Sequence, residues 1–264
     1  MIMQRIAIII PAYNEEKRIG PTLESYTSFF DSIEKKGELK YTLLVVVNNS
    51  KDKTIDIVKA FAKKNKHIQY LDLIRGGKGY ATIEGFKKAL KGDYDGIGFV
   101  DADSSTPPQA YLDLINALPG WDGVIASRWM KGSTVKTPQT FFRRILSRGF
   151  NILNRGILFL HFTDTQCGAK IFTPASLVKI IPHLGLTQWS FDIEVLFKLK
   201  QAGFKVREIP TIWEDQKNSR LNVLKVPFQM FTSIVRLRLL NSPFNFIVRA
   251  YDVMPEALKI HHRL

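Results

Sequence analysis

The sequence is poor in cysteine: its 264 residues include only one, Cys167. A disulfide framework is therefore excluded, and the composition is compatible with a reducing compartment. Long apolar runs are also missing, since no stretch approaches the roughly 20 apolar residues that cross a bilayer. The opening residues, MIMQRIAIIIPAYNEE, turn polar too early for a secretory signal. We expect a chain without a transmembrane helix.

Acidic residues are scarce in the second half of the chain. The formal net charge is +14, and the stretches 123–163 and 216–251 contain neither Asp nor Glu. Such a basic balance favours an anionic partner: nucleic acid, anionic lipid or a phosphorylated ligand. Because the basic residues are interleaved with Phe, Leu, Ile and Trp, we favour an anionic membrane surface. No recognition motif accompanies the charge, so we expect no nucleic-acid partner.

The first half of the chain alternates short β-branched runs with segments of helical periodicity. This alternation predicts an α/β fold, with a mostly parallel sheet flanked by helices on both faces. Beyond it we expect a long amphipathic helix over 138–162 and a basic, apolar helical segment over 222–240. The expected strands are 5–10, 41–47, 67–73, 96–100, 122–127 and 204–210, and the expected helices are 14–35, 52–64, 80–90, 108–118, 174–181 and 191–201.

Polar segments follow the first four predicted strands. In a parallel sheet, ligands bind beyond the carboxyl ends of the strands. The glycines of the third segment let the backbone approach a ligand, and its lysine offers a charge to phosphate, although the spacing is neither Walker A nor G-x-G-x-x-G. The four segments are PAYNE (11–15), NNSKD (48–52), RGGKG (75–79) and DAD (101–103).

Two pairs of acids are candidates for chemistry. Asp101 and Asp103 are hard oxygen ligands, suited to Mg²⁺ or Mn²⁺ held together with substrate phosphates. Asp192 and Glu194 lie in the first turn of a predicted helix, where they either complement the helix dipole or serve the acceptor. The five histidines show no metal-ligand spacing and are interpreted as structural or surface residues. Cys167 is interpreted as a buried, inert thiol.

Taken together, these segments resemble a family-2 glycosyltransferase of the GT-A fold, the nucleotide-diphospho-sugar transferase fold. ASR (126–128), DTQCGAKIF (164–172), FDIE (191–194) and NSRL (218–221) complete the pattern, whose order and spacing match over residues 5–225. Within that family the chain is most similar to the polyprenyl-phosphate sugar synthases, the dolichyl-phosphate glucosyltransferases and mannose synthases. DTQCG followed by FD-x-E is the more specific signature, because PAYNE and DAD occur throughout the superfamily.

The resemblance implies a role for each matching residue. Asp101 and Asp103 would hold the metal, and Arg128, Ser219 and Arg220 would bind the phosphate of the donor or acceptor. Asp192 and Glu194, with Arg128, would form the catalytic set beside the sugar and the acceptor. The nucleotide-sugar pocket would be lined by Pro11, Ala12, Tyr13, Asn14, Glu15, Asn48, Lys78, Asp101 and Ala102.

The chain departs from the family where Asn48-Asn49-Ser50-Lys51 replaces the usual Asp-Asp-Gly-Ser. An asparagine amide suits the N3–H and O4 of uracil, whereas guanine presents two donors and would prefer a carboxylate, so UDP is favoured over GDP. Mannose synthases often carry Gln where this chain has Ser105. We also expect a glycosyltransferase domain over residues 1–220 and a basic amphipathic C-terminal appendage over 221–264.

The expected activity is inverting, metal-dependent transfer of a hexose, glucose favoured, from a UDP-sugar to polyprenyl (dolichyl) phosphate. The enzyme would be peripherally associated with the cytoplasmic side of a membrane. An acceptor phosphate is already anionic near neutral pH, because its second pKa is about 6, so Asp192 and Glu194 are expected to position it rather than deprotonate it.

Three alternatives stay open. One is a dolichyl-phosphate mannose synthase that uses GDP-mannose. Another keeps the fold but transfers to a glycan or glycolipid hydroxyl, which would make Asp192 or Glu194 a true base. The third is a nucleotide-sugar binding module without activity, which the intact DAD, Lys78 and FDIE disfavour. A membrane-anchored protein partner and a homo-oligomer are both compatible with the sequence.

Overall fold

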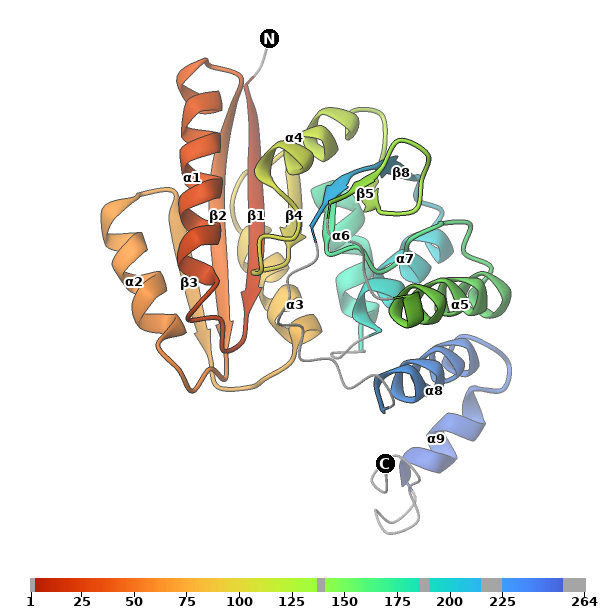
Figure 1. Ribbon diagram of the computed structural model, residues 1–264. Coiled ribbons are helices and arrows are strands. Elements are labelled where there is room, and N and C mark those ends of the chain that lie inside the picture. The colour runs from red at the N-terminus through yellow and green to blue at the C-terminus, as the bar shows by residue number, and fades with distance from the viewer. Residues whose placement is uncertain (1–2, 137–140, 186–189, 215–224, 254–264) are drawn as a thin grey trace. The chain divides into compact units, whose positions relative to one another are not determined.

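A large mixed sheet forms the centre of the fold (Figure 1). The computed structural model describes residues 3–136, 141–185, 190–214 and 225–253, with side chains in the helices at 141–158 and 225–240 described from residues 148 and 231 onward. Within these ranges, no helix is long and apolar enough to cross a membrane.

As far as residue 127, strands and helices alternate in the order that the sequence predicts. The strands of the large sheet are β1 (Gln4–Ala12), β2 (Leu39–Asn48), β3 (Ile68–Leu73), β4 (Gly96–Val100), β5 (Gly123–Ser127), β7 (Ala169–Phe172) and β8 (Val206–Pro210), and a separate parallel pair is formed by β6 (Thr134–Val135) and β9 (Ile212–Trp213). The helices are α1 (Ile19–Lys35), α2 (Thr54–Lys64), α3 (Lys78–Ala89), α4 (Pro108–Ala117), α5 (Phe141–Leu158), α6 (Pro174–Ile180), the short 3-10 helix η1 (Ile181–His183), α7 (Phe191–Gln201), α8 (Lys225–Leu240) and α9 (Asn245–Val253).

The sheet order is β3-β2-β1-β4-β7-β5-β8. Its described strands are parallel except β7, which is inserted antiparallel between β4 and β5. The register places Lys170 of β7 opposite Phe99 of β4. The mostly parallel sheet is confirmed, and the reversal of β7 brings the segment before it to the carboxyl end of β4.

Two cores lie on the two faces of the sheet, because alternate residues of a strand point to opposite faces. In β1, Ile6, Ile8 and Ile10 pack with α1 and α4, whereas Ala7 and Ile9 pack with α3, α6 and α7. This double coverage explains why the central strands are apolar at nearly every position. It also leaves the polar loops at the carboxyl ends of the strands outside the two cores.

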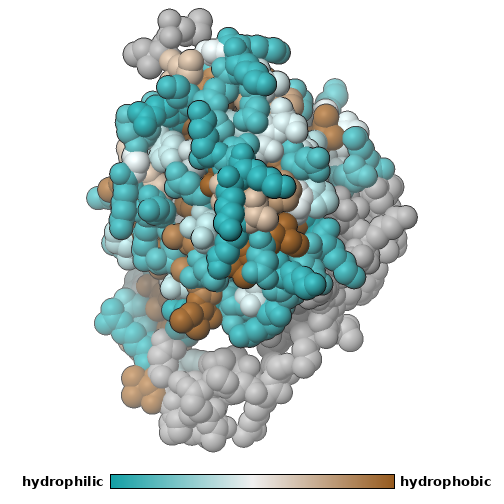
Figure 2. All heavy atoms as spheres, turned by 90° about the vertical axis from the view of Figure 1, so that its left-hand side faces the viewer, coloured by the Kyte–Doolittle hydropathy of each residue, from teal (hydrophilic) through white to brown (hydrophobic). Residues whose placement is uncertain are grey.

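The edge strand β3 is more exposed than the central strands. Ile68 is buried, Leu71 and Leu73 are partly buried, and Gln69, Tyr70 and Asp72 are exposed. Together with α2, it belongs to a mainly hydrophilic face on which apolar side chains are scattered (Figure 2). β3 has a neighbouring strand on one side only, and its greater exposure agrees with this position at the edge of the sheet.

The first helix begins later than its periodicity predicts. Asn14 has a φ of 53°, which is incompatible with a right-handed helix. The carbonyl of Glu15 instead accepts from the N–H groups of Arg18 and Ile19, and α1 starts at Ile19. The residues between β1 and α1 are thus a loop, which is where the PAYNE segment lies.

The chain divides into two compact units. The first comprises residues 1–138 and 163–217 and contains the large sheet, and the second comprises 139–162 and 218–264. The second unit therefore includes α5 as well as α8 and α9, whereas the sequence placed the boundary at residue 220. Within it, α8 contacts both α5 and α9.

Candidate active site

Four charged side chains from three elements and one loop form a network at the carboxyl end of β4. The ammonium of Lys78, the first residue of α3, lies 2.6 Å from Asp101 Oδ1 and 3.5 Å from Asp192 Oδ2. Lys170 of β7 binds Asp192 Oδ1 at 2.5 Å. Asp192 belongs to the first turn of α7, so the network joins residues that are far apart in the sequence.

Lys170 is the most deeply buried member, with a side chain that is 0% exposed. Its Nζ also donates to the carbonyl of Cys167 at 2.6 Å. The ring of Phe99 lies beneath both ammoniums, 5.3 Å from Lys170 Nζ and 5.7 Å from Lys78 Nζ. A buried lysine needs such partners, because an unpaired buried charge is strongly unfavourable.

The network holds Asp192 in its ionised form. Burial on its own would raise the pKa of the Asp192 carboxyl, but Lys170 and Lys78 outweigh it and hold that pKa below its ordinary value. For Lys78, burial would lower the pKa, and Asp101 and Asp192 raise it instead. Asp192 is therefore a fixed anion and a weak base.

Asp101 is under the opposite influence. Burial raises the pKa of its carboxyl, the carboxylates of Asp103 and Asp192 add to the rise, and Lys78 opposes it. Three carboxylates here face two ammoniums, Lys78 and Lys170. The excess negative charge and the oxygen donors of Asp101 and Asp103 fit a divalent cation that arrives with substrate phosphates, since Mg²⁺ is typically bound by one or two carboxylates plus phosphate.

Gly168 allows Asp101 to take this position. A Cβ at Gly168 would lie 1.8 Å from Asp101 Oδ2, closer than any side chain could tolerate. The backbone N–H of Asp101 donates to the carbonyl of Gly168 at 3.1 Å. The glycine of the DTQCG segment is thus explained by close approach to the first aspartate of DAD.

The loop that carries Asp103 is braced by α1. Thr22 Oγ1 donates to the carbonyl of Ala102 at 2.8 Å and lies 2.6 Å from Ser104 Oγ. Asp103 Oδ1 accepts from the N–H of Ser105 at 3.0 Å, and Ser104 has a φ of 61°. These contacts fix the turn in which Asp103 follows Asp101.

The first two polar segments bind each other. Asn14 Oδ1 accepts from the N–H of Lys51 at 2.8 Å, and the N–H of Glu15 donates to Thr54 Oγ1 at 2.8 Å. Pro11 and Ala12 are buried at the end of β1, while Tyr13 is 51% exposed. The tyrosine ring is thereby open to a ligand, and its place in the nucleotide pocket stays a prediction.

Asn48 is used differently from what its type indicates. It is 1% exposed, its Nδ2 donates to the carbonyl of Ala12 at 2.9 Å, and its Oδ1 accepts from the N–H of Gly77 at 3.1 Å. The amide ties the end of β1 to the residue just before Lys78. A contact between Asn48 and a nucleotide base stays a prediction. In the structure its side chain holds the RGGKG segment through Gly77.

Arg128 is locked to Asp164. Its Nε and Nη2 donate to the two carboxylate oxygens of Asp164 at 2.6 and 2.9 Å, and its backbone N–H donates at 3.0 Å. Asp164 is 0% exposed; burial would raise its pKa, but Arg128 holds that pKa below the ordinary value. A guanidinium has five N–H donors, and Asp164 accepts from two of the guanidinium nitrogens of Arg128. A role for Arg128 in binding phosphate is therefore compatible with this contact and stays a prediction.

Glu194 does not join the network of charges around Lys78 that the structure describes. The residue is 3% exposed, and its carboxylate accepts from the N–H of Gly185 at 2.9 Å. Residues two apart on a helix do not share a face, which separates Glu194 from Asp192. Ser219 and Arg220, predicted at the acceptor phosphate, lie outside the described residues.

The structure brings Lys78 into contact with both Asp101 and Asp192 and places Asp103 on the adjoining turn. Lys170, Asp164 and Gly168 were given no role of their own by the sequence. All three lie in DTQCGAKIF. The available signal was Lys170 itself, because a lysine flanked by apolar residues in a short strand indicates a buried charge that needs a partner.

The model of glycosyl transferase family 2 matches residues 7–180, a span that contains Lys78, Asp101, Asp103 and Lys170. The chain belongs to glycosyltransferase family 2. Three members of the network, Lys78, Asp101 and Lys170, lie within the matched span, at the carboxyl ends of the strands, where ligands bind in such sheets.

Relatives of this glycosyltransferase include dolichyl-phosphate beta-glucosyltransferases. The protein of Drosophila melanogaster is 31% identical over 230 residues, which cover 82% of this chain and 69% of the relative. That of Dictyostelium discoideum is 29% identical over 243 residues, covering 88% and 73%. The human protein is 28% identical over 251 residues, covering 89% and 75%.

Solved structures share the fold. Glucosyl-3-phosphoglycerate synthase from Mycobacterium tuberculosis in complex with UDP superposes with a TM-score of 0.64 at 18% identity, covering 89% of this chain and 79% of that one. Its complex with Mn²⁺, UDP and glucosyl-3-phosphoglycerate gives a TM-score of 0.64 at 16% identity, with the same coverage. The expected GT-A fold of this glycosyltransferase is confirmed.

Replacing Lys170 by Met is expected to destabilise the enzyme by about 3–5 kcal/mol, because the Asp192 carboxylate is left buried without its main partner. Urea unfolding measures the loss. The double variant Lys170→Met/Asp192→Leu should regain most of it, and Lys179→Met, at an exposed lysine of α6, should change little. A double variant as unstable as the single one would contradict the ion pair.

The stability supplied by Asp192 should depend on pH. Its folded pKa is lower than its unfolded value of about 3.9, so the ionised carboxylate stabilises the fold above that pH, and the contribution disappears as pH falls through the folded pKa. The difference in unfolding free energy between the wild type and Asp192→Asn is therefore expected to be constant above about pH 5 and to narrow below pH 4. A difference that stays constant down to pH 3 would show that Asp192 is not held ionised.

Proposed function

We propose that this glycosyltransferase transfers glucose from UDP-glucose to dolichyl phosphate, with inversion and with a divalent metal. The observation that carries the proposal is that Asp192 forms ion pairs with both Lys170 and Lys78, at 2.5 and 3.5 Å. A carboxylate held ionised by two ammoniums suits an acceptor that needs no deprotonation. The names of the relatives, dolichyl-phosphate beta-glucosyltransferases, supply the same acceptor.

The transfer needs no proton to move. An oxygen of the acceptor phosphate attacks C1 of glucose, the bond from C1 to the UDP oxygen breaks, and its electron pair stays on the diphosphate. Attack from the opposite side turns an α-linked donor into a β-linked product. Asp101 and Asp103 would hold Mg²⁺ or Mn²⁺, which supplies neutralisation of the charge on the leaving diphosphate.

The lysines complete the charge balance. Lys78, 35% exposed, is the ammonium that a bound diphosphate would reach, and leaving Asp101 for the diphosphate would cost it little, since both partners are anions. Lys170 is fully buried and stays with Asp192. We infer that Lys78 stabilises the departing diphosphate, while Lys170 keeps Asp192 in place.

A transfer assay tests the proposal. Purified enzyme with Mg²⁺ or Mn²⁺ and a short polyprenyl phosphate is given labelled UDP-glucose or GDP-mannose, and label entering the organic phase is counted. UDP-glucose should give a metal-dependent product that falls at least ~100-fold in Asp103→Ala, as when a charge-stabilising group is removed. Asp113→Ala, at an exposed aspartate of α4, serves as the matched control.

The outcomes separate the alternatives. Product from GDP-mannose alone would assign mannose transfer. No lipid-linked product, together with transfer to a glycan hydroxyl that depends on Glu194, would overturn the proposed acceptor. Donor hydrolysis that persists in Asp103→Ala would overturn the assigned metal ligands.

We further propose that the second unit meets an anionic membrane surface. Phe244, Phe246 and Ile247 are 56%, 61% and 46% exposed, and Arg249 is exposed nearby on α9. Apolar rings beside arginine in a segment without acids favour the interface of a lipid bilayer. The expected location is the cytoplasmic face, where the anionic lipids lie.

Vesicle pelleting tests this surface. With vesicles containing anionic lipid at low salt, Phe244→Ser/Phe246→Ser should weaken binding by about tenfold per phenylalanine, the effect of losing roughly 1.5 kcal/mol of apolar burial each. Ile74→Ser, at a residue 96% exposed in the first unit, is the matched control and should bind normally. Equal binding by all three proteins would contradict the assignment.

A further inference from the structure

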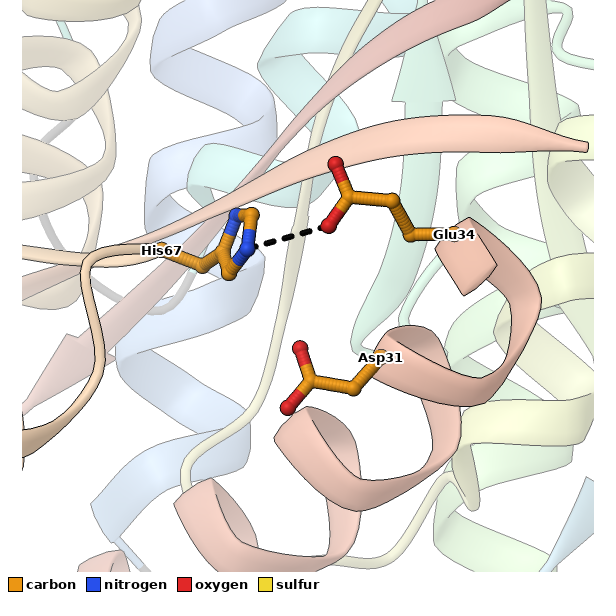
Figure 3. A group of neighbouring side chains, drawn as sticks. All are labelled: Asp31, Glu34 and His67. Carbon is orange, nitrogen blue, oxygen red and sulfur yellow. Dashed lines mark ion pairs between the residues drawn. The ribbon is translucent and has the colours of Figure 1, made fainter. Parts of the chain in front are cut away.

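A second group of ligand-type side chains lies away from the site described above. Asp31 and Glu34 project from the last turn and a half of α1, and His67 projects from the turn before β3 (Figure 3). Their nearest ligand atoms all lie within 4.8 Å of one another. In Figure 3 the three side chains point into the same space, and the dashed line joins His67 to Glu34.

This group is remote from the candidate active site. Tyr41, beside His67, is near the start of β2, and Asn48 is at its end. Seven residues of a strand span about 23 Å. Any ion held by the group would therefore be separate from one held by Asp101 and Asp103.

The hydrogen bonds of His67 show which of its nitrogens is open. Nδ1 lies 3.1 Å from the backbone carbonyl of Tyr41, and a carbonyl only accepts, so Nδ1 carries a proton. In a neutral ring Nε2 is then a bare acceptor. Yet Nε2 lies 3.0 Å from Glu34 Oε2, which is also an acceptor. Two acceptors at this distance require a positive charge between them, either a second proton or a metal ion.

The surroundings of the group resemble the outer shell of a metal site. A metal-binding histidine usually donates its other N–H to a backbone carbonyl, as His67 does to Tyr41. The hydroxyl of Tyr41 donates to Asp31 Oδ1 at 2.5 Å, and its ring stacks on His67 with centroids 4.5 Å apart. The ion pair with His67 involves Glu34 alone, whereas a metal ion would take Asp31 as a ligand as well.

We propose that Asp31, Glu34 and His67 bind a divalent transition-metal ion with the ligand preference of zinc, one that takes imidazole and carboxylate together. Ligand atoms around tetrahedral zinc are about 3.3 Å apart, so the 3.0 Å between His67 and Glu34 needs little change. Water would complete the coordination. The ion would tie the end of α1 to the turn before β3, which is a structural role.

Nearby bases set the expected strength of the site. Arg5, Lys40 and Lys66 line the same hollow and oppose a cation. All three are exposed, and Arg5 pairs with Asp93, so water screens their charge. Two carboxylates and an imidazole in direct contact with the ion would outweigh these screened positive charges at longer range.

Metal titration of the full chain tests the proposal. Metal-free enzyme carrying Asp103→Ala, which removes the expected catalytic ligand, is titrated with Zn²⁺ by calorimetry and with Co²⁺ by visible absorption. One Zn²⁺ should bind per chain, and binding should be lost in His67→Gln and in Glu34→Gln. Tyr41→Phe, which removes only the hydroxyl on Asp31, should weaken it about tenfold. His183→Gln, at an exposed histidine of the 3-10 helix, should bind as before.

Circular dichroism and melting of the metal-free variants establish that each is folded, and the isosteric Glu34→Gln guards against loss of structure in His67→Gln. Zinc binding that survives both substitutions, or no binding by the parent at micromolar zinc, would overturn the proposal. The charge between His67 and Glu34 would then be a proton.

Discussion

The buried ion pair between Lys170 and Asp192 is the interaction on which the rest of the candidate site depends. Either partner alone would lose its closest counter-charge in this interior, which is strongly unfavourable for a buried ion. Together they fix the first turn of α7 against β7, and Asp192 in turn reaches Lys78. Through Lys78 the same pair sets the orientation of Asp101, so one buried contact orders groups from three elements and a loop.

The topology of the sheet makes this contact available. Because β7 is antiparallel to β4, the residues that precede it arrive at the carboxyl end of β4, where Gly168 meets Asp101 and Lys170 faces Phe99. If β7 were parallel to β4, the residues that precede it would lie at the amino ends of the strands instead. The reversed strand β7 thus brings Lys170 and Gly168 to the carboxyl ends of the parallel strands, where ligands bind in such sheets.

The sequence predicted the parallel strands of the large sheet and the strand ends that carry the polar segments, because apolar runs and the polar segments after them are local patterns. The PAYNE, RGGKG and DAD segments do meet there. It could not predict that Asn48 serves Ala12 and Gly77, or that Lys170 finds Asp192, because these partners are set by packing across long separations. For the same reason, the spacing of the histidines in the sequence did not indicate that His67 would lie beside Asp31 and Glu34 of α1. The sequence also predicted the start of the first helix too early. Asn14 adopts a left-handed conformation, and α1 begins only at Ile19.

The electrostatic state of Asp192 limits which acceptors the site can activate. A hydroxyl must lose a proton as it attacks, and a base for that step works best when its pKa is raised toward neutrality. Lys170 and Lys78 act in the opposite direction on the pKa of Asp192, and Glu194 is bound to the N–H of Gly185 instead. A phosphate monoester carries its negative charge before it arrives, so the same two lysines that weaken Asp192 as a base do not hinder it. In the proposed reaction, charge already present on the acceptor phosphate would take the place of a catalytic base.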